Sequence, residues 1–156
     1  MNWHVKIAAW LWGCIAGLLL WGGWLPSAAN AATTVDLARQ PVIEQAVSLG
    51  TSDNRFVFVP DHLTFKVGDR YKLVLSNPST QKHYFTAKDF ADSIWTQKVD
   101  AGKVEIKGAI HDLELKPGAS ADWVFVPMKS GTYSLRCSIP GHAEAGMVGT
   151  LAIVVN

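Results

Sequence analysis

Apolar and polar residues alternate along much of the chain, in short runs separated by turn-forming residues. Leu63, Phe65 and Val67 alternate with polar neighbours, and residues 71–75 repeat the pattern. A period of two residues is typical of a half-buried strand. Runs of strand character also cover residues 42–49, 82–86, 94–99, 104–107, 110–115, 121–126, 131–136 and 148–155. Turn signals about every ten residues then indicate an all-β sandwich or barrel.

Helical periodicity is nearly absent after residue 31. No run there exceeds about two turns, and residues 87–92 are expected to hold a single helical turn. The core of the all-β domain is expected to collect large apolar side chains from the inward faces of the strands. These are Phe56, Phe58, Phe65, Leu73, Leu75, Trp123, Phe125, Tyr133, Leu135, Leu151 and Ile153.

The first 31 residues differ in character from the rest. Lys6 is the only charged residue before Asp36, residues 7–25 are all apolar or glycine, and Ala29-Asn-Ala31 follows. A basic start, an apolar middle and an Ala-x-Ala end are the layout of a secretory signal peptide. We predict a signal peptide over residues 1–31, a linker over 32–41 and one domain over 42–156.

An uncleaved anchor is the alternative for this leader. The apolar run of residues 7–25 approaches the ~20 residues needed for a membrane-spanning helix, so it could serve as a membrane tether. In either case the domain is exported, and the sequence does not distinguish the periplasm from the thylakoid lumen.

Charge and cysteine content narrow the function. Cleavage after Ala31 leaves 125 of the 156 residues, enough for one self-sufficient core. Basic and acidic residues are then equal in number, without the basic surplus of a nucleic-acid-binding protein. Cys137 is the single remaining cysteine, so in an oxidising compartment it is a free thiol or a metal ligand.

One loop near the C-terminus carries the candidate chemistry. Residues 137–147 read Cys-Ser-Ile-Pro-Gly-His-Ala-Glu-Ala-Gly-Met, between the expected strands 131–136 and 148–155. The loop therefore places Cys137, His142 and Met147 where three donors can turn toward one point. A thiolate with imidazoles and a weak thioether suits a one-electron copper site. A second imidazole must come from another part of the chain.

His83 is the best candidate for that imidazole. The chain has five histidines, of which His4 belongs to the leader. His62 follows a Pro-Asp turn and His111 stands beside an aspartate, so both are expected at the surface. His83 opens the expected strand 82–86.

Each candidate ligand has an ordinary structural explanation when it is taken alone. Cys137 fits an inert core thiol, Met147 fits core filling and His142 fits a loop histidine. The combination of all three in one short loop between two strands favours a metal site.

The domain resembles the cupredoxin family, which includes plastocyanin, azurin, auracyanin and rusticyanin. The motifs are Gly131-Thr-Tyr133, Cys137-Ser-Ile-Pro-Gly-His142 and Gly146-Met-Val-Gly149, with a looser match from Phe65 to His83. The resemblance implies a Greek-key β-sandwich and one type 1 copper ion. By the same match the copper ligands would be His83, Cys137, His142 and Met147.

Tyr84 departs from the family pattern. Cupredoxins usually have asparagine or serine after the first histidine, where it ties the two ligand loops together near the sulfur. With Tyr84 there, this link is expected to be lost or to be made by the backbone alone. Backbone amides near Ile139 or His142 are then candidate donors to the sulfur.

The resemblance implies a non-enzymatic carrier of single electrons outside the cytoplasm. Its partners would be redox proteins such as a cytochrome or a membrane redox complex. They would dock at an apolar patch around His142 that is made up of Ile139, Pro140, Gly141, Ala143, Ala145 and Gly146.

Other functions were weighed against electron transfer. A copper carrier or an accessory copper-binding subunit of a membrane redox complex is the main alternative. A dinuclear Cu-A centre is excluded for the mature chain, because it needs two thiolates. Nucleophilic catalysis by cysteine and histidine is disfavoured, because nothing in the sequence indicates an oxyanion hole or a substrate pocket.

Overall fold

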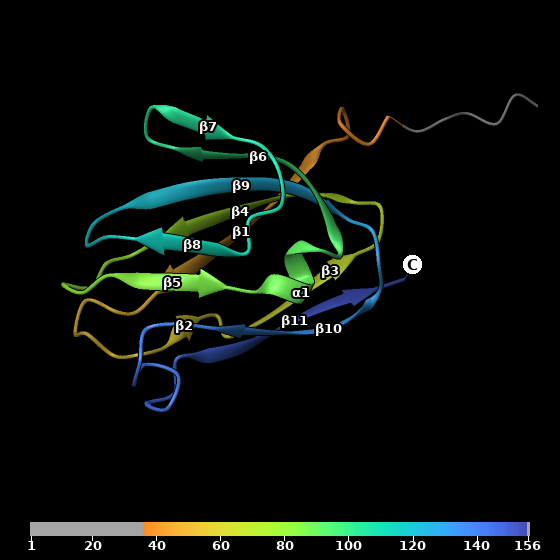
Figure 1. Cartoon of the computed structure of the whole chain (residues 1–156). Coiled ribbons are helices and arrows are strands. Elements are labelled where there is room, and N and C mark those ends of the chain that lie inside the picture. The colour runs from red at the N-terminus through yellow and green to blue at the C-terminus, as the bar shows by residue number, and fades with distance from the viewer. Residues whose placement is uncertain (1–35, 156) are drawn as a thin grey trace, which may run out of the picture. The chain divides into compact units, whose positions relative to one another are not determined.

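The computed structural model describes residues 36–155, which form two β-sheets joined by short loops and one helical turn (Figure 1). The signal peptide or anchor predicted over residues 1–31 lies outside this range. Within it, no helix has both the length and the apolar character needed to cross a membrane. In chain order the elements are β1 (Val42–Leu49), β2 (Phe58–Val59), β3 (His62–Lys66), β4 (Arg70–Ser76), β5 (His83–Thr86), α1 (Lys88–Ala91), β6 (Ile94–Ala101), β7 (Val104–Ile106), β8 (Asp112–Leu115), β9 (Ser120–Pro127), β10 (Gly131–Arg136) and β11 (Val148–Val154).

The strands divide between a six-stranded and a five-stranded sheet. The six-stranded sheet has the order β2-β1-β4-β9-β6-β7, and the other has the order β3-β11-β10-β5-β8. β1 pairs with β4 and β3 pairs with β11 in parallel, while the remaining pairs are antiparallel. The all-β sandwich predicted from the alternation is confirmed, and each predicted strand is present with ends within two residues of the expected ones.

Alternating burial follows from the pleat of the strands, because successive side chains point to opposite faces. In β4, Tyr71, Leu73 and Leu75 are buried while their neighbours are more exposed. β9 is buried nearly throughout, and it lies inside the six-stranded sheet between β4 and β6.

A cluster of aromatic rings joins the two sheets. Phe65, from the five-stranded sheet, has its ring centroid 5.0 Å from Tyr71 and 5.3 Å from Phe125, both in the six-stranded sheet. Phe90, on α1, lies 5.5 Å from Phe65. Most of these rings meet edge to face, which is a favourable geometry for aromatic pairs.

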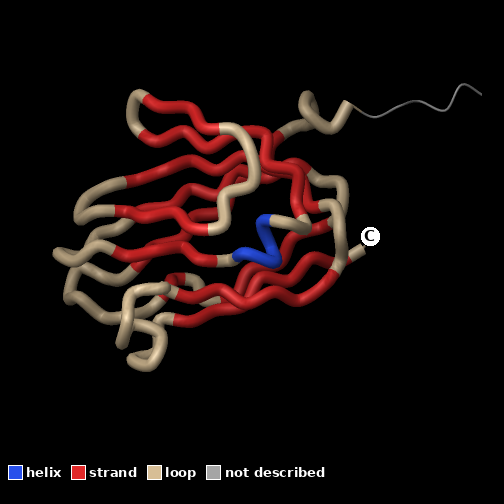
Figure 2. Tube along the Cα trace, in the orientation of Figure 1, coloured by secondary structure: helices blue, strands red, loops and turns tan. Residues whose placement is uncertain are grey.

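The single helical turn α1 matches the prediction for residues 87–92 and stands out among strands and loops in Figure 2. Its buried Phe90 was not expected in the core, because the surrounding sequence is polar.

Nine of the eleven predicted core residues are buried. The exceptions are Phe56 and Tyr133, which are only partly buried and pack at the margin of the core.

Replacing Phe65 with alanine should destabilise the fold strongly, because the cavity would open at the centre of the aromatic cluster. We expect the free energy of unfolding to fall by about 3–5 kcal/mol in chemical denaturation. Met128→Ala is the matched control, since Met128 is 53 % exposed, and it should change stability by less than about 0.5 kcal/mol. Equal effects of the two changes would contradict this account of the core.

Candidate metal centre

A buried amide fixes the loop that delivers His83. Asn77 Nδ2 donates to the carbonyl oxygens of Gln81 at 2.7 Å and of Leu115 at 2.9 Å. The Ser79 backbone N–H and hydroxyl both donate to Asn77 Oδ1, at 3.0 and 2.8 Å. Because Leu115 lies opposite His83 in the β5–β8 ladder, Asn77 anchors the loop to the strand that pairs with the histidine.

The loop of residues 137–147 is closed by its own backbone. The Cys137 N–H donates to the Met147 carbonyl at 3.0 Å, and the Met147 N–H donates to the His142 carbonyl at 2.9 Å. Gly141 and Gly146 have φ of +86° and +106°, values that favour glycine. The β10–β11 hairpin thus ends in a tight loop that holds three candidate ligands.

The structure brings His83, Cys137 and His142 together. The two Nδ1 atoms lie 3.3 Å apart, and the Cys137 Sγ lies 3.5 Å from the His142 Nδ1. The candidate ligand atoms of the three residues all lie within 4.8 Å of one another. Exposure is 1 % for His83 and Cys137 and 8 % for His142, so the donors meet in a site almost closed to water.

Two residues that the sequence did not link to the site hold the imidazole rings in place. Phe56 was predicted as a core residue, but its ring lies 4.3 Å from that of His142 and 6.1 Å from that of His83. The Gly50 backbone packs against the His83 ring, since a Cβ built at residue 50 would stand 2.9 Å from the Nε2 atom of His83. The only sequence signal at Gly50 is a glycine after a strand, which does not connect it to residue 83.

Burial prepares His83 for metal binding. Desolvation lowers the pKa of its imidazole below the ordinary value of 6.5, and the neighbouring His142 ring lowers it further. The ring is therefore neutral at neutral pH. A metal-binding imidazole must be in this state.

The sulfur of Cys137 accepts a hydrogen bond from the other ligand strand. The Tyr84 backbone N–H donates to Sγ at 3.3 Å. The link between the two ligand loops is therefore made by the backbone, which was one of the two outcomes expected from the sequence. The donor differs from the expected amides near Ile139 or His142. The N–H of His142 donates instead to the Ile139 carbonyl at 3.1 Å.

Two of the three donor separations match those of ligands on one metal ion. A tetrahedral first-row ion with bonds of about 2.0–2.3 Å separates its nitrogen and sulfur ligands by roughly 3.3–3.6 Å. The observed separations of 3.3 and 3.5 Å fall in this range. Met147 is completely buried, and its backbone is hydrogen-bonded to the backbones of Cys137 and His142, so the residue lies next to both of them in the loop.

A family comparison identifies the metal. The sequence profile described as "Copper binding proteins, plastocyanin/azurin family" matches residues 45–154. The chain belongs to this family. As a plastocyanin/azurin-family protein it takes copper as its cofactor, and the cluster of His83, Cys137 and His142 is consistent with a single type 1 copper site.

One curated relative is also similar to the chain. The chain is 28 % identical over 106 residues to the "Copper-resistant cuproprotein CopI" of Rubrivivax gelatinosus, a match that covers 62 % of this chain and 59 % of the relative.

Of two solved structures that are similar to the chain, the one with the higher TM-score shows the same fold. A "Cu-containing nitrite reductase (NirK) from Thermus scotoductus SA-01" matches with a TM-score of 0.57 and 17 % identity, over 76 % of this chain and 32 % of that one. The dithionite-reduced auracyanin of Roseiflexus castenholzii matches with a TM-score of 0.47 and 18 % identity, over 74 % and 98 % of the two chains.

The remaining described histidines lie at the surface, as predicted. His62 bonds Asp61 at 2.8 Å and His111 bonds Asp92 at 2.7 Å, both in exposed positions.

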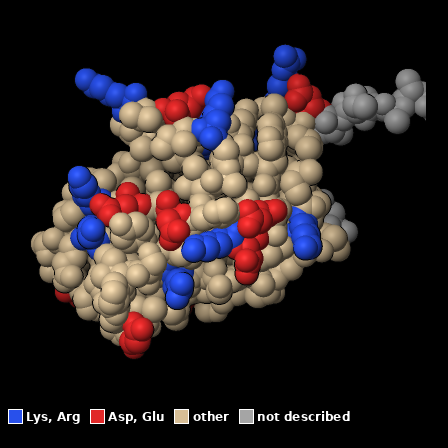
Figure 3. All heavy atoms as spheres, in the orientation of Figure 1, with Lys and Arg blue, Asp and Glu red and all other residues tan. Residues whose placement is uncertain are grey.

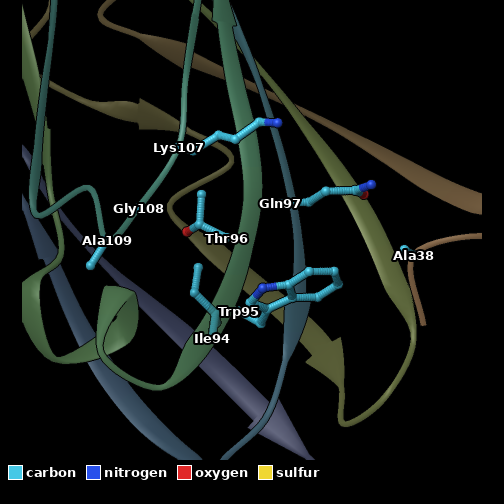
Figure 4. Close-up of a pocket in the computed structure, with 8 residues that line it drawn as sticks. All are labelled: Ala38, Ile94, Trp95, Thr96, Gln97, Lys107, Gly108 and Ala109. Carbon is cyan, nitrogen blue, oxygen red and sulfur yellow. The ribbon is translucent and has the colours of Figure 1, made fainter. Parts of the chain in front are cut away.

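A separate pocket lies beside β6. It is lined by Ala38, Ile94, Trp95, Thr96, Gln97, Lys107, Gly108 and Ala109 (Figure 4). These lining residues include no histidine, cysteine or carboxylate, so the pocket offers no counterpart to the copper ligands.

Gly50→Ala should disturb the copper site more than an equally strained substitution elsewhere. Gly50 and Gly118 have φ of +80° and +71°, so alanine costs about 1–2 kcal/mol of strain at either position. Only at Gly50 would the new methyl group also press on His83. We expect copper affinity to fall about 10–100-fold in Gly50→Ala and to be retained in Gly118→Ala, as measured by competition with a chelator. Equal affinities would show that Gly50 does not hold the ring.

Proposed function

We propose that the protein carries single electrons between redox partners outside the cytoplasm, with one copper ion held by His83, Cys137, His142 and Met147. The observation that carries this proposal is the convergence of the first three, from two distant loops, on one buried point. Bound copper supplies a one-electron couple between Cu(I) and Cu(II). A thiolate, two imidazoles and a thioether suit both oxidation states.

The rigidity of the ligand loops supports electron transfer. His83 is held through the Asn77 hydrogen bonds and the β5–β8 ladder, and the 137–147 loop is closed by backbone hydrogen bonds. The donors are therefore in position before a metal binds. A preformed site requires little rearrangement when the charge on the ion changes.

The closure of the site supports a carrier rather than an enzyme. Cys137 and His83 are 1 % exposed and Met147 is completely buried, so these side chains offer almost no surface to a substrate. His142, at 8 % exposure, presents only an edge to the surface. Electrons can cross such an edge while water and substrates stay outside.

Export is supported by the sequence before the described residues. Residues 1–31 have the layout of a signal peptide, or of an anchor through residues 7–25, and either would place the domain in the periplasm or the thylakoid lumen. The buried, free Cys137 fits such a compartment when its thiolate is engaged by a metal.

Partner docking is proposed at the apolar patch around His142. Pro140, Gly141, Ala145 and Gly146 are exposed around the buried ring, and Glu144 is the one charged residue among them. Small, weak interfaces of this kind suit transient redox encounters with a cytochrome or a membrane redox complex. Elsewhere, charges of both signs are interspersed on the face drawn in Figure 3. This face therefore lacks the basic patch that a nucleic-acid-binding surface would have.

Copper delivery is the second candidate function. It is favoured by the similarity to a relative whose name attributes copper resistance to it. A carrier or an accessory copper-binding subunit would use the same donors but would exchange the ion readily.

Copper loading followed by absorption and potential measurements tests the proposed function. The wild-type protein should show intense visible thiolate-to-copper absorption and a reversible one-electron couple. Cys137→Ser should abolish the absorption, because the band requires the thiolate. Met147→Leu should keep the band and raise the potential, because the thioether acts as a weak, tuning ligand. A colourless wild-type complex with Cu(II) would refute the proposal.

The rate of copper release separates the two candidates. A shuttle should retain copper against a high-affinity chelator over many reduction and oxidation cycles. Rapid release of Cu(I), without fast electron exchange, would instead support delivery.

Ala145→Arg should slow electron exchange between copies of the protein by at least about tenfold, because like charges would face each other across the patch. Visible absorption should remain, since Ala145 is exposed and is not a ligand. Ala109→Arg adds the same charge to an exposed site between β7 and β8 and serves as the control. Equal exchange rates, measured at low ionic strength, would argue against docking at the patch.

A further inference from the structure

Tyr84 connects the copper site to a polar cluster on the outside of the sheet. Its backbone N–H donates to the Cys137 sulfur, while its side chain points to the opposite face from the buried His83 and Phe85. The phenolic hydroxyl donates to Glu114 Oε2 on β8. One residue thus touches the sulfur with its backbone and a carboxylate with its side chain.

The segment that carries this N–H is weakly held on the side facing β10. The β5–β10 ladder consists of one residue pair, Thr86 with Arg136. The ladder to β8 is complete, and it pairs Tyr84 directly with Glu114. β8 is itself the edge strand of the sheet and is four residues long. The position of the Tyr84 N–H therefore depends on how firmly β8 is attached to β5.

Side chains reinforce this attachment at both ends. Thr86 Oγ1 donates to Asp112 at 2.7 Å, at the end that β10 also supports. At the copper end Glu114 accepts from both Tyr84 and Lys82, the latter at 3.3 Å. The Lys82 ammonium group also lies 5.7 Å from the centre of the Tyr84 ring. The hydrogen bond from Tyr84 keeps the pKa of the Glu114 carboxyl below its ordinary value, so Glu114 is an ionised acceptor at neutral pH.

We propose that Glu114 is a positioning residue that tunes the reduction potential of the copper site by holding Tyr84, and thereby its N–H, against the Cys137 sulfur. The inference rests on the proposed electron-transfer function. A hydrogen bond to the thiolate draws electron density from the sulfur and favours the reduced state. Loosening Tyr84 therefore lowers the potential.

Tyr84→Phe is the sharpest test, because it removes the bond to Glu114 without changing charge. We expect a lower reduction potential, so that at the wild-type midpoint the ratio of oxidised to reduced protein rises several-fold above one, and a shifted thiolate-to-copper band. Tyr133→Phe is the matched control. Its hydroxyl donates to the Lys129 carbonyl at 2.8 Å, and Tyr133 is not part of the metal centre.

Variants of Glu114 separate positioning from simple electrostatics. Loss of a nearby negative charge alone would raise the potential in Glu114→Ala and Glu114→Gln alike. Positioning predicts instead that Glu114→Ala lowers the potential at high salt, where surface charge effects are screened, and that Glu114→Gln largely restores it, since the amide oxygen still accepts from Tyr84. The double variant Tyr84→Phe/Glu114→Ala should shift no further than either single variant.

Amide hydrogen exchange at Tyr84 gives an independent readout, both without copper and in the reduced protein. The N–H should exchange several-fold faster in Tyr84→Phe than in the wild type or in Tyr133→Phe. If Tyr84→Phe matches Tyr133→Phe in potential, absorption and exchange, the inference is wrong. If the wild type lacks a reversible copper couple, the proposed function fails, and exchange in the metal-free protein, measured also for Glu114→Ala, still decides whether Glu114 holds the Tyr84 N–H in place.

Discussion

The hydrogen bond from the Tyr84 N–H to the Cys137 sulfur is the contact on which the site depends. It joins positions 53 residues apart in the chain. The ladder between β5 and β10 stops after the pair Thr86–Arg136, one residue before Cys137. Beyond that pair the thiolate takes the place of a backbone carbonyl as acceptor. The sheet thus opens where the copper ligands lie, and the sulfur satisfies a partly buried N–H that has no carbonyl partner on β10.

The interior of the sandwich and the end that carries the copper ligands have different structural roles. Aromatic rings from both sheets, centred on Phe65 and Phe125, pack the interior and fix how the sheets face each other. The start of β5 and the β10–β11 loop gather at one end of the molecule (Figure 1). There the stabilising contacts include hydrogen bonds from Asn77 and from the loop backbone. A packed core therefore leaves this end free to be built from polar, directional contacts that define ligand geometry.

The sequence predicted what is periodic or local and missed what crosses between distant segments. Strands could be predicted because their side chains alternate with period two, and the 137–147 ligands could be predicted because one short loop carries them. His83 was found because the ligand set was incomplete without a second imidazole. Gly50 and the ring contacts of Phe56 could not be found, since nothing in either segment encodes its proximity to His83 or His142. The donor to the sulfur was likewise sought in the wrong loop, because sequence spacing does not show where a ladder ends.

The same contacts bear on whether this family member moves electrons or copper. Release of the ion would require the most exposed ligand, His142, to leave first, because the other donors are at most 1 % exposed. Its movement would separate its ring from that of Phe56, which lies 4.3 Å away. An electron needs none of these changes, since it can cross the ring edge while the loop stays closed. Release of the ion thus requires a ligand to move, whereas passage of an electron does not. This difference favours the electron shuttle over the copper carrier.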